Sequence, residues 1–400
     1  MNINYDKIRQ LSEDYRSHTA ETLSALVKIP SFSGEEKNVI HKLKQLCEEA
    51  GFDRVEIDGL GNLVAEIGRG SKILAFDAHI DTVTVGDPAQ WNTDPFSGII
   101  TDEHVLGRGS TDQKGGAASM ITAGRILKEL GYDGEFKILL TFTIMEEDCD
   151  GMCWKYMIEE ENIIPDFFVS TEPSSCNIYR GHRGRMEMKV KFRGISCHGS
   201  APERGDNAAY KAARGAAAME KLNDELPPDD ENFLGKGTIV VSQMSAAGPS
   251  QCAVPDTAEL YLDRRLTWGE TEEFAVNQVK DAIPESEDVT VPYYDKISWK
   301  GTKYGQDLYF PTWKIDADHP LVTSGVTAYQ KLYGSRVKVD KWTFSTNAVA
   351  VCGRYSIPTI GFGPGDENEA HAPNEKNRIS DLVTCSAFYA ALVYSLEGSI

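Results

Sequence analysis

The sequence predicts an α/β fold in which helices cover both faces of a mostly parallel sheet, with a smaller α+β unit inserted into it. Three observations lead to this prediction. Strand-like and helix-like segments alternate before residue 181 and again after residue 320, which is typical of parallel sheets. The pattern changes between residues 183 and 296. The chain also has 400 residues, more than one hydrophobic core usually holds.

The first part of the chain reads as helices and strands in turn. In GEEKNVIHKLKQLCEEAGF (34–52), apolar residues recur at helical spacing from Val39 to Leu46, and Gly51 ends the helix. The strands RVEI and NLVAEI surround the turn DGLGN. The segments that follow are the buried strand KILAF, a helix over GGAASMITAGRILKEL, the strand FKILLTFTI, a helix near GMCWKYMIEEE and the strand DFFVS.

A second unit is predicted where the pattern changes. In GHRGRMEMKVKFRG, apolar residues from Met186 to Phe192 alternate with charged ones, which indicates a half-exposed strand. The helix NAAYKAARGAAAMEKL, the strands GTIVVSQMSA and TAELYLDRRL, the helix TEEFAVNQVKDAI and the strand EDVTVPYY follow. This β-α-β-β-α-β order is the ferredoxin-like arrangement. We therefore expect the main unit over 1–182 and 297–400, and the inserted unit over 183–296.

The composition of the chain indicates which partners it can bind and in which cellular compartment it works. The formal net charge of −20 argues against nucleic acid or an anionic membrane as a partner. The polar, acidic start has no cleavable signal pattern, and no apolar run approaches a membrane span. Eight scattered cysteines are typical of reduced thiols. We expect a cytoplasmic protein that acts on a small molecule.

Ionisable residues gather at the predicted strand ends. Such groups are costly to bury unless they are paired or bound to a metal, and ligands of open α/β sheets bind beyond the carboxyl ends of the strands. Five separate segments deliver candidates to this edge. The candidates are His79 and Asp81 in AFDAHID, Asp112 in GRGSTDQKGG, Glu146 and Glu147 in TIMEEDCDG, Glu172 in VSTEPS, and His371 in GPGDENEAHAPNE.

The spacing of these residues suggests a metal centre. His79 and Asp81 are two residues apart and point to one side of an extended chain. His79 can then bind a metal while Asp81 accepts its other N–H. Glu146 and Glu147 are neighbours, and two such carboxylates would divide the roles of ligand and general base. Two histidines with several carboxylates suit a pair of Zn²⁺ ions, and Co²⁺ or Mn²⁺ is compatible.

The motifs AHIDTV, GRGSTDQKGG, MEED, TEP, CHGSAP and EAHAPNE, in this order, resemble the co-catalytic zinc amidohydrolase and peptidase family. That family includes acetylornithine deacetylase, succinyl-diaminopimelate desuccinylase and carboxypeptidase G. The resemblance covers nearly the whole chain. Strings such as EEDCDGMCW and DKWTFSTN look closest to the selenium-metabolism-linked hydrolases within it. The resemblance implies that His79 and Glu172 hold one zinc, Glu147 and His371 the other, that Asp112 bridges them, that Glu146 is the general base, and that Asp81 orients His79.

The resemblance also implies features outside the metal ligands. It implies a zinc-peptidase-like catalytic unit and a cis peptide between Asp112 and Gln113. The inserted unit would serve as a lid and form a homodimer. His198, in SCHGSAP, would reach into the partner's active site and stabilise the oxyanion of the tetrahedral intermediate.

The residues that recognise substrate are less clearly marked. In relatives, an arginine at the position of LYLDRR grips a substrate carboxylate in bidentate fashion. Only one of Arg264 and Arg265 can face the cleft, and we favour Arg265. Asn347, in FSTNAV, stands where many relatives carry an aspartate, and we place it in the substrate pocket.

These features predict a metal-dependent hydrolase of an amide-like C–N bond in a small N-substituted amino acid or ureide-like compound. Glu146 would take a proton from the attacking water and deliver it to the leaving amine. A dipeptidase or carboxypeptidase with the same dizinc site is the nearest alternative. A non-catalytic scaffold on this fold is a third, and the intact Glu146 argues against it.

Overall fold

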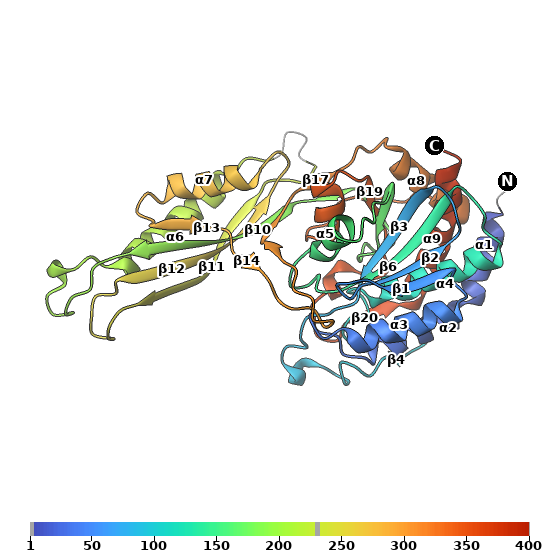
Figure 1. The fold of residues 1–400 in the computed structure, drawn as a ribbon, viewed down its shortest axis with the longest axis horizontal. Helices are drawn as coiled ribbons and strands as arrows, with labels where there is room; N and C mark the ends of the chain where they lie inside the picture. The colour runs from blue at the N-terminus through green and yellow to red at the C-terminus, as the bar shows by residue number, and fades with distance from the viewer. Residues whose placement is uncertain (1–3, 229–232, 400) are drawn as a thin grey trace.

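The protein consists of a broad unit and a narrower one that projects from it (Figure 1). The computed structural model describes residues 4–228 and 233–399. The broad unit contains both ends of the described chain, and the narrower unit is built around residues 184–290. The predicted fold class, a parallel-rich α/β unit with an inserted α+β unit, is confirmed.

The main sheet, within the described residues, has eight strands in the order β1-β2-β6-β3-β7-β19-β8-β18. Its central strands β6, β3, β7 and β19 are parallel to one another, so their carboxyl ends meet at one edge. β1 and β2 extend the sheet in antiparallel fashion. The strands are β1 (Arg54–Ile57), β2 (Leu63–Ile67), β3 (Lys72–His79), β6 (Phe136–Thr143), β7 (Phe167–Ser170), β8 (Ile178–Tyr179), β18 (Val339–Asp340) and β19 (Thr359–Gly361).

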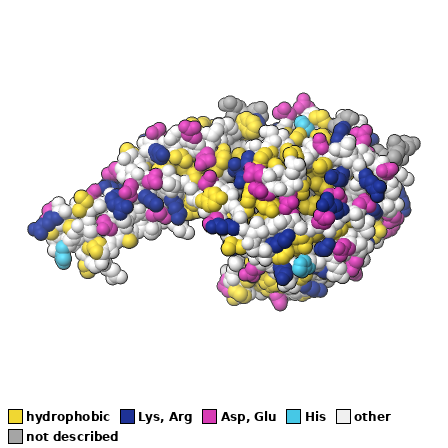
Figure 2. Space-filling view, viewed as in Figure 1, with side chains coloured by type: hydrophobic (Ala, Val, Ile, Leu, Met, Phe, Trp, Pro, Cys, Tyr) yellow, Lys and Arg dark blue, Asp and Glu magenta, His cyan; other side chains and the backbone are white. Residues whose placement is uncertain are grey.

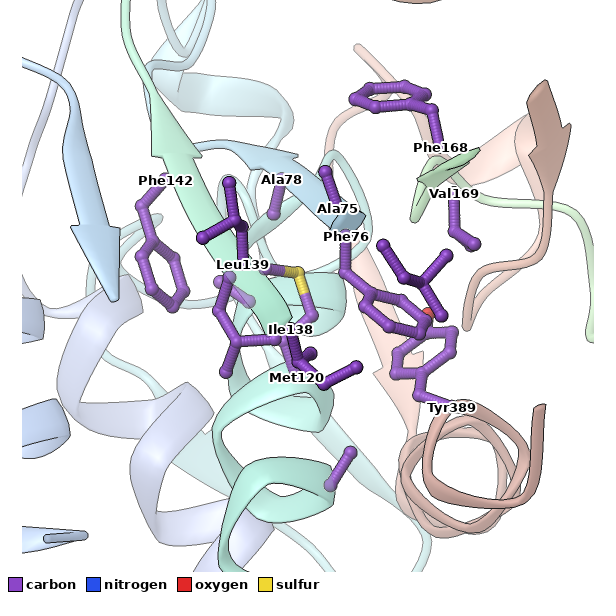
Figure 3. Close-up of a cluster of buried hydrophobic side chains, with 14 of the residues drawn as sticks. Ala75, Phe76, Ala78, Met120, Ile138, Leu139, Phe142, Phe168, Val169 and Tyr389 are labelled. Carbon is purple, nitrogen blue, oxygen red and sulfur yellow. The ribbon is translucent and has the colours of Figure 1, made fainter. Parts of the chain in front are cut away.

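Helices bury both faces of this sheet. Phe76 of β3 packs against Tyr389, with ring centroids 5.4 Å apart, and Met120 lies on the same side (Figure 3). Phe76 is in register with Val169, so the residue before Val169, Phe168, points to the opposite face, where it packs edge-on against Trp154. The helices of the main unit are α1 (Tyr5–Asp14), α2 (Arg16–Val27), α3 (Lys37–Glu49), α4 (Lys114–Glu129), α5 (Met152–Glu159), α8 (Pro320–Tyr333) and α9 (Ile379–Glu397).

Helix α9 is the most apolar of these helices. Contrary to the expectation that no apolar run approaches a membrane span, among the described residues it is the one helix with that length and composition, but 78% of its 18-residue apolar window is buried inside the protein. A helix that is apolar on all sides is expected in the interior of a large domain. Here α9 packs against α4, α8 and α1, so it is a core helix.

The smaller unit has the predicted β-α-β-β-α-β order. Its sheet order is β11-β12-β10-β13, with β16 added beside β10, in the part of the chain that the structure describes. Residues Met186 to Phe192 alternate between a buried face against the two helices and a charged open face. Figure 2 shows acidic and basic side chains interspersed over this unit. Its elements are β10 (Gly184–Arg193), α6 (Ala208–Glu225), β11 (Thr238–Ala247), β12 (Thr257–Leu266), α7 (Glu272–Ala282), β13 (Asp288–Thr290) and β16 (Tyr309–Phe310).

Short elements connect these layers. Strand β5 pairs with β4 and β20, β9 pairs with β17, and β14 pairs with β15. They are β4 (Ile99–Ile100), β5 (His104–Leu106), β9 (Gly181–His182), β14 (Tyr293–Tyr294), β15 (Gln306–Asp307), β17 (Trp313–Lys314) and β20 (Lys376–Arg378), with the short helices η1 (Pro88–Gln90), η2 (Pro202–Arg204), η3 (Val349–Arg354) and η4 (Glu367–Glu369).

Candidate metal centre

The predicted strand-end residues lie together around one cavity. His79 is the last residue of β3, Glu146 and Glu147 follow β6, and Glu172 follows β7. Asp112 precedes α4, and His371 follows η4. The cavity has a volume of about 330 Å³ and is lined by His79, Asp112, Glu146, Glu147, Asp150, Glu172, Arg185, Arg265, Phe344, Ser345, Glu367, Ala370 and His371.

Asp112 lies between two histidines. Its Oδ1 is 2.9 Å from His79 Nε2, and its Oδ2 is 3.3 Å from His371 Nε2. Glu172 Oε1 is 3.6 Å from His79 Nε2, and Glu147 Oε2 is 2.9 Å from His371 Nε2. The potential ligand atoms therefore form two groups that share Asp112, each with its atoms within 4.8 Å of one another.

The ring of His79 is oriented by a backbone carbonyl. Its Nδ1 is 3.0 Å from the carbonyl oxygen of Asp81 and 3.6 Å from the carboxylate oxygen Oδ1 of the same residue. Because a carbonyl oxygen only accepts, Nδ1 carries the proton and donates it. In the neutral ring, the lone pair of Nε2 then faces Asp112 and Glu172, as a metal ligand requires.

The carboxylate of Asp81 has a different task from the predicted one. It accepts hydrogen bonds from the backbone N–H groups of Glu146 and Glu147, both at 3.1 Å, and from the hydroxyl of Ser33 at 2.6 Å. We expected this carboxylate to accept the N–H of His79. In the structure this carboxylate holds the turn that carries both glutamates, while the carbonyl of the same residue lies closer to the ring N–H.

A buried carboxylate, Glu375, supports the loop of Asp112. It accepts hydrogen bonds from the backbone N–H groups of Thr111 at 2.7 Å and Asp112 at 3.0 Å, and Arg108 pairs with it at 2.7 Å. The peptide bond between Asp112 and Gln113 is cis, as the resemblance implied. Sequence reasoning missed Glu375, although it is the last residue of the motif EAHAPNE.

Negative charge is crowded in this cavity. Burial, together with the charges of neighbouring carboxylates, raises the pKa of Glu146 and Glu172 well above the ordinary range. Burial opposes protonation of His79, but the charges of Glu146 and Glu172 outweigh it and raise the pKa of the imidazole. Hydrogen bonds to Asp112 and Glu147 raise the pKa of His371 to about 10. The protein without cations therefore retains extra protons here.

Glu146 stands beside the ligand groups. Its Oε2 is 3.8 Å from His79 Nε2, and its side chain lines the cavity. It belongs to neither group of ligand atoms found among the described residues. Its carboxylate is therefore placed to exchange a proton with a molecule in the cavity.

Two arginines of the inserted unit line the opposite side of the cavity. Arg185 of β10 and Arg265 of β12 are directly paired across the two strands. Arg265 forms an ion pair with Asp263 at 2.8 Å, whereas Arg264 points to the other face of the sheet. Sequence reasoning missed Arg185. The alternation of apolar and charged residues in this strand places Arg185 on its open face. It does not show that this face lies against the strand ends of the main unit.

Two other predicted residues lie away from the cavity. His198 is exposed, and its Nδ1 is 2.7 Å from the hydroxyl of Ser200; it does not line the cavity within this chain. Asn347 is buried, and its amide donates to Asp77 at 2.9 Å and to Thr143 at 3.1 Å. Its carbonyl accepts the backbone N–H of Gly151. Asn347, which we expected to contact substrate, therefore does not line this cavity; its amide hydrogen-bonds to a buried aspartate behind β3.

Comparison with known proteins places this arrangement in a family. The family model of peptidase family M20/M25/M40 matches residues 75–395. The chain belongs to this family. The M20 family consists of metallohydrolases of amide bonds, and the chain is one of them.

Individual M20 relatives match almost the whole chain. The uncharacterized protein YgeY of Escherichia coli strain K12 is 50% identical over 397 residues, which cover 98% of each chain. Acetylornithine deacetylase of Aliivibrio salmonicida is 27% identical over 373 residues, 91% of this chain and 92% of the relative.

Solved M20 structures show the same fold. The metallo-carboxypeptidase Sso-CP2 of Sulfolobus solfataricus has a TM-score of 0.74 at 17% identity, over 95% of this chain and 99% of that one. The YXEP protein of Bacillus subtilis, described as a dinuclear metal-binding peptidase, has a TM-score of 0.72 at 14% identity, over 97% and 100%.

Proposed function

We propose that this chain hydrolyses an amide-like C–N bond in a small N-substituted amino acid or ureide-like compound, at a site that holds two divalent cations. The observation that carries this proposal is the position of Asp112, which is shared by two groups of ligand atoms, with Glu146 beside them. Relatives named as a deacetylase and a desuccinylase support hydrolysis at an acylated nitrogen.

The donor set fits a pair of metal ions. His79, Asp112 and Glu172 would hold one, and Asp112, Glu147 and His371 the other. The raised pKa values of Glu146, Glu147 and Glu172 reflect burial and the crowding of carboxylates, which cations would relieve. Imidazole with carboxylate is a typical ligand set for Zn²⁺, and Co²⁺ or Mn²⁺ suits the same atoms.

Glu146 is the general base of the proposed reaction. When bound, the cations would polarise the carbonyl of the substrate and lower the pKa of water at the site. The carboxylate of Glu146 removes a proton from the attacking water and returns it to the nitrogen of the leaving amine. Asp81 keeps Glu146 in place through the backbone N–H, and the carbonyl of Asp81 fixes the tautomer of His79.

Arg265 recognises a carboxylate of the substrate. It lines the cavity and reaches it from β12, opposite the ligand groups. Its guanidinium uses Nε and one terminal nitrogen to bind Asp263, so the other terminal nitrogen retains its donors for a second carboxylate. This arrangement favours substrates that carry a free carboxylate.

We also propose that the protein works as a cytoplasmic homodimer assembled through the inserted unit, with unit boundaries at residues 182 and 296. His198 is exposed on the inserted unit and does not line the cavity of its own chain. A partner subunit that supplies it would complete the site with a donor for the oxyanion.

A substrate panel tests the proposed reaction. The protein, reconstituted with Zn²⁺ or Co²⁺, is offered N-acetyl and N-succinyl amino acids, N-carbamoyl amino acids and free-amino dipeptides, and release of amine is measured. The proposal predicts turnover of an N-acyl or N-carbamoyl amino acid. Turnover of free-amino dipeptides alone would establish the rival function, a dipeptidase or carboxypeptidase with the same metal centre.

A further inference from the structure

The turn that follows β6 bears the residues of the proposed chemistry. It contains Glu146 and Glu147, and two further carboxylates, Asp148 and Asp150, follow at once. Met145, just before the turn, has a positive φ of 60°, a conformation that a residue with a side chain rarely adopts. A turn of this kind keeps its shape only when surrounding groups hold it.

The main unit holds the beginning of the turn. Besides the two bonds to the Asp81 carboxylate, the buried carboxylate of Glu36 accepts the backbone N–H of Met145 at 3.2 Å. The hydroxyl of Ser33 bonds to Asp81, so residues 33–36 brace both sides. These contacts hold the backbone of residues 145–147 against the main unit.

The end of the turn is held by segments that lead into and out of the inserted unit. Tyr294 of β14 donates its hydroxyl to Asp148 Oδ2 at 2.9 Å, and Lys296 Nζ donates to the same oxygen at 2.9 Å. Arg185, near the start of β10, pairs with Asp150 Oδ1 at 3.2 Å. The side-chain amide of Gln306 donates to the carbonyl of Asp150 at 3.1 Å.

These bonds have one feature in common. Each runs from β10 of the inserted sheet, or from a segment that follows this sheet in the chain, to a residue within four positions of Glu146. Lys296 also donates to the carbonyl of Ser33 at 2.8 Å. It therefore contacts both Asp148, at the end of the turn, and the 33–36 segment, which holds the beginning of the turn. The general base and one metal ligand therefore sit on a backbone segment held between the two units.

We propose that Asp148 and Asp150 are positioning residues that fasten the Glu146–Glu147 turn, Asp148 to the segment that leads out of the inserted unit and Asp150 to β10 of that unit. The inference rests on the proposed function, since it concerns the placement of a proposed base and a proposed ligand. Neither aspartate is a ligand in either group. They act through Glu147, whose Oε2 must stay near His371 for the second group to form. Asp150 also connects the turn to Arg185, which lines the cavity.

The test removes the supports without changing the turn itself. The double variant Tyr294→Phe/Lys296→Met deletes both donors to Asp148. Lys303→Met is the matched control, because Lys303 pairs at 2.7 Å with Asp295 in the same segment and its pair is exposed. Lys296→Arg in the Tyr294→Phe background restores a charged donor. Each metal-free protein is titrated with Co²⁺, and the binding isotherm and visible absorption spectrum are recorded, with thermal unfolding measured alongside.

The expected result is that one of two Co²⁺ ions binds about ten-fold more weakly to the double variant, as for loss of groups that orient metal ligands. Its absorption spectrum should change, and the control should match the unchanged protein. The Lys296→Arg variant should recover part of the affinity. If the unchanged protein binds two Co²⁺ ions and the double variant binds them equally tightly with the same spectrum, the positioning role is overturned. The proposed function is unaffected by that result. If the unchanged protein binds no Co²⁺, the proposed function itself fails.

Discussion

Arg264 and Arg265 are neighbours in the chain, yet their guanidinium groups lie on opposite faces of the same sheet. Arg264 is buried against Glu270, with 2.7 Å between Nη2 and Oε1, whereas Arg265 lines the cavity. Strand geometry requires this, because successive side chains point to opposite sides. One residue serves the fold of the inserted unit, and the next is available to a substrate.

Replacement of the two arginines should therefore have different effects. Arg265→Gln should raise KM for an N-acyl amino acid about 10- to 100-fold, since it removes a charged contact to the substrate carboxylate, with little change in stability. Arg264→Gln should cost about 3 kcal/mol of unfolding free energy, because Glu270 is left buried without its partner. Steady-state kinetics and urea unfolding separate the two effects. Equal KM values for Arg265→Gln and the unchanged protein would remove Arg265 from the substrate site.

Glu146→Gln tests the assignment of the general base. The amide keeps the shape of the side chain but does not accept a proton from water, so kcat should fall by about 10² to 10⁴. Metal content should stay unchanged, because Glu146 belongs to neither ligand group of the described residues. The measurement is kcat together with metal per chain. Retention of full activity in the variant would assign the proton transfer to another group.

Complementation between inactive variants tests the role of His198. In a homodimer, a His198→Ala subunit retains Glu146 and a Glu146→Gln subunit retains His198, so a hybrid contains one complete site if the histidine acts across the interface. Random mixing of dissociated subunits should restore about a quarter of the parent activity. Activity of the mixture equal to the mean of the two variants alone would show that His198 does not serve the partner's site.

Glu36 makes the stability of the metal-free protein depend on pH. Burial, and after it the charge of Asp81, raises the pKa of Glu36 from its ordinary value of 4.5 to about 8. The folded state thus keeps a proton that the unfolded chain releases, and stability falls as pH rises from 4.5 to about 8.

Glu36→Gln retains an oxygen that accepts the N–H groups of Gly34 and Met145 but does not titrate. Between pH 6 and pH 8, the unfolding free energy should fall by about 2 kcal/mol more in the unchanged protein than in Glu36→Gln. Urea unfolding with a chelator present measures the difference. Parallel pH profiles would show that Glu36 is ionised in the folded state throughout this range.

Residue order was sufficient to predict the fold class and the convergence of the ligand-bearing segments. The parallel strands β3, β6 and β7 end together, so His79, Glu147 and Glu172 had to approach one another. The alternation from Met186 to Phe192 likewise indicated which face of the inserted sheet is buried.

Contacts between distant segments were beyond such reasoning. Asn347 binds Asp77, 270 positions away, and no local pattern shows that this amide points behind β3 and not into the cavity. Arg185 joins the site because the inserted sheet meets the main one. For Asp81, the spacing from His79 gave the side of the strand, but not that the carbonyl would bind the ring while the carboxylate holds the turn.

We propose that Asp112 would be shared by two cations, and metal content tests this most directly. Protein purified without chelator, then reconstituted and freed of excess metal, is analysed for metal per chain by elemental analysis. The shared position of Asp112 between two ligand groups predicts about two ions per chain. One ion per chain, or none, after reconstitution would contradict the two-metal site.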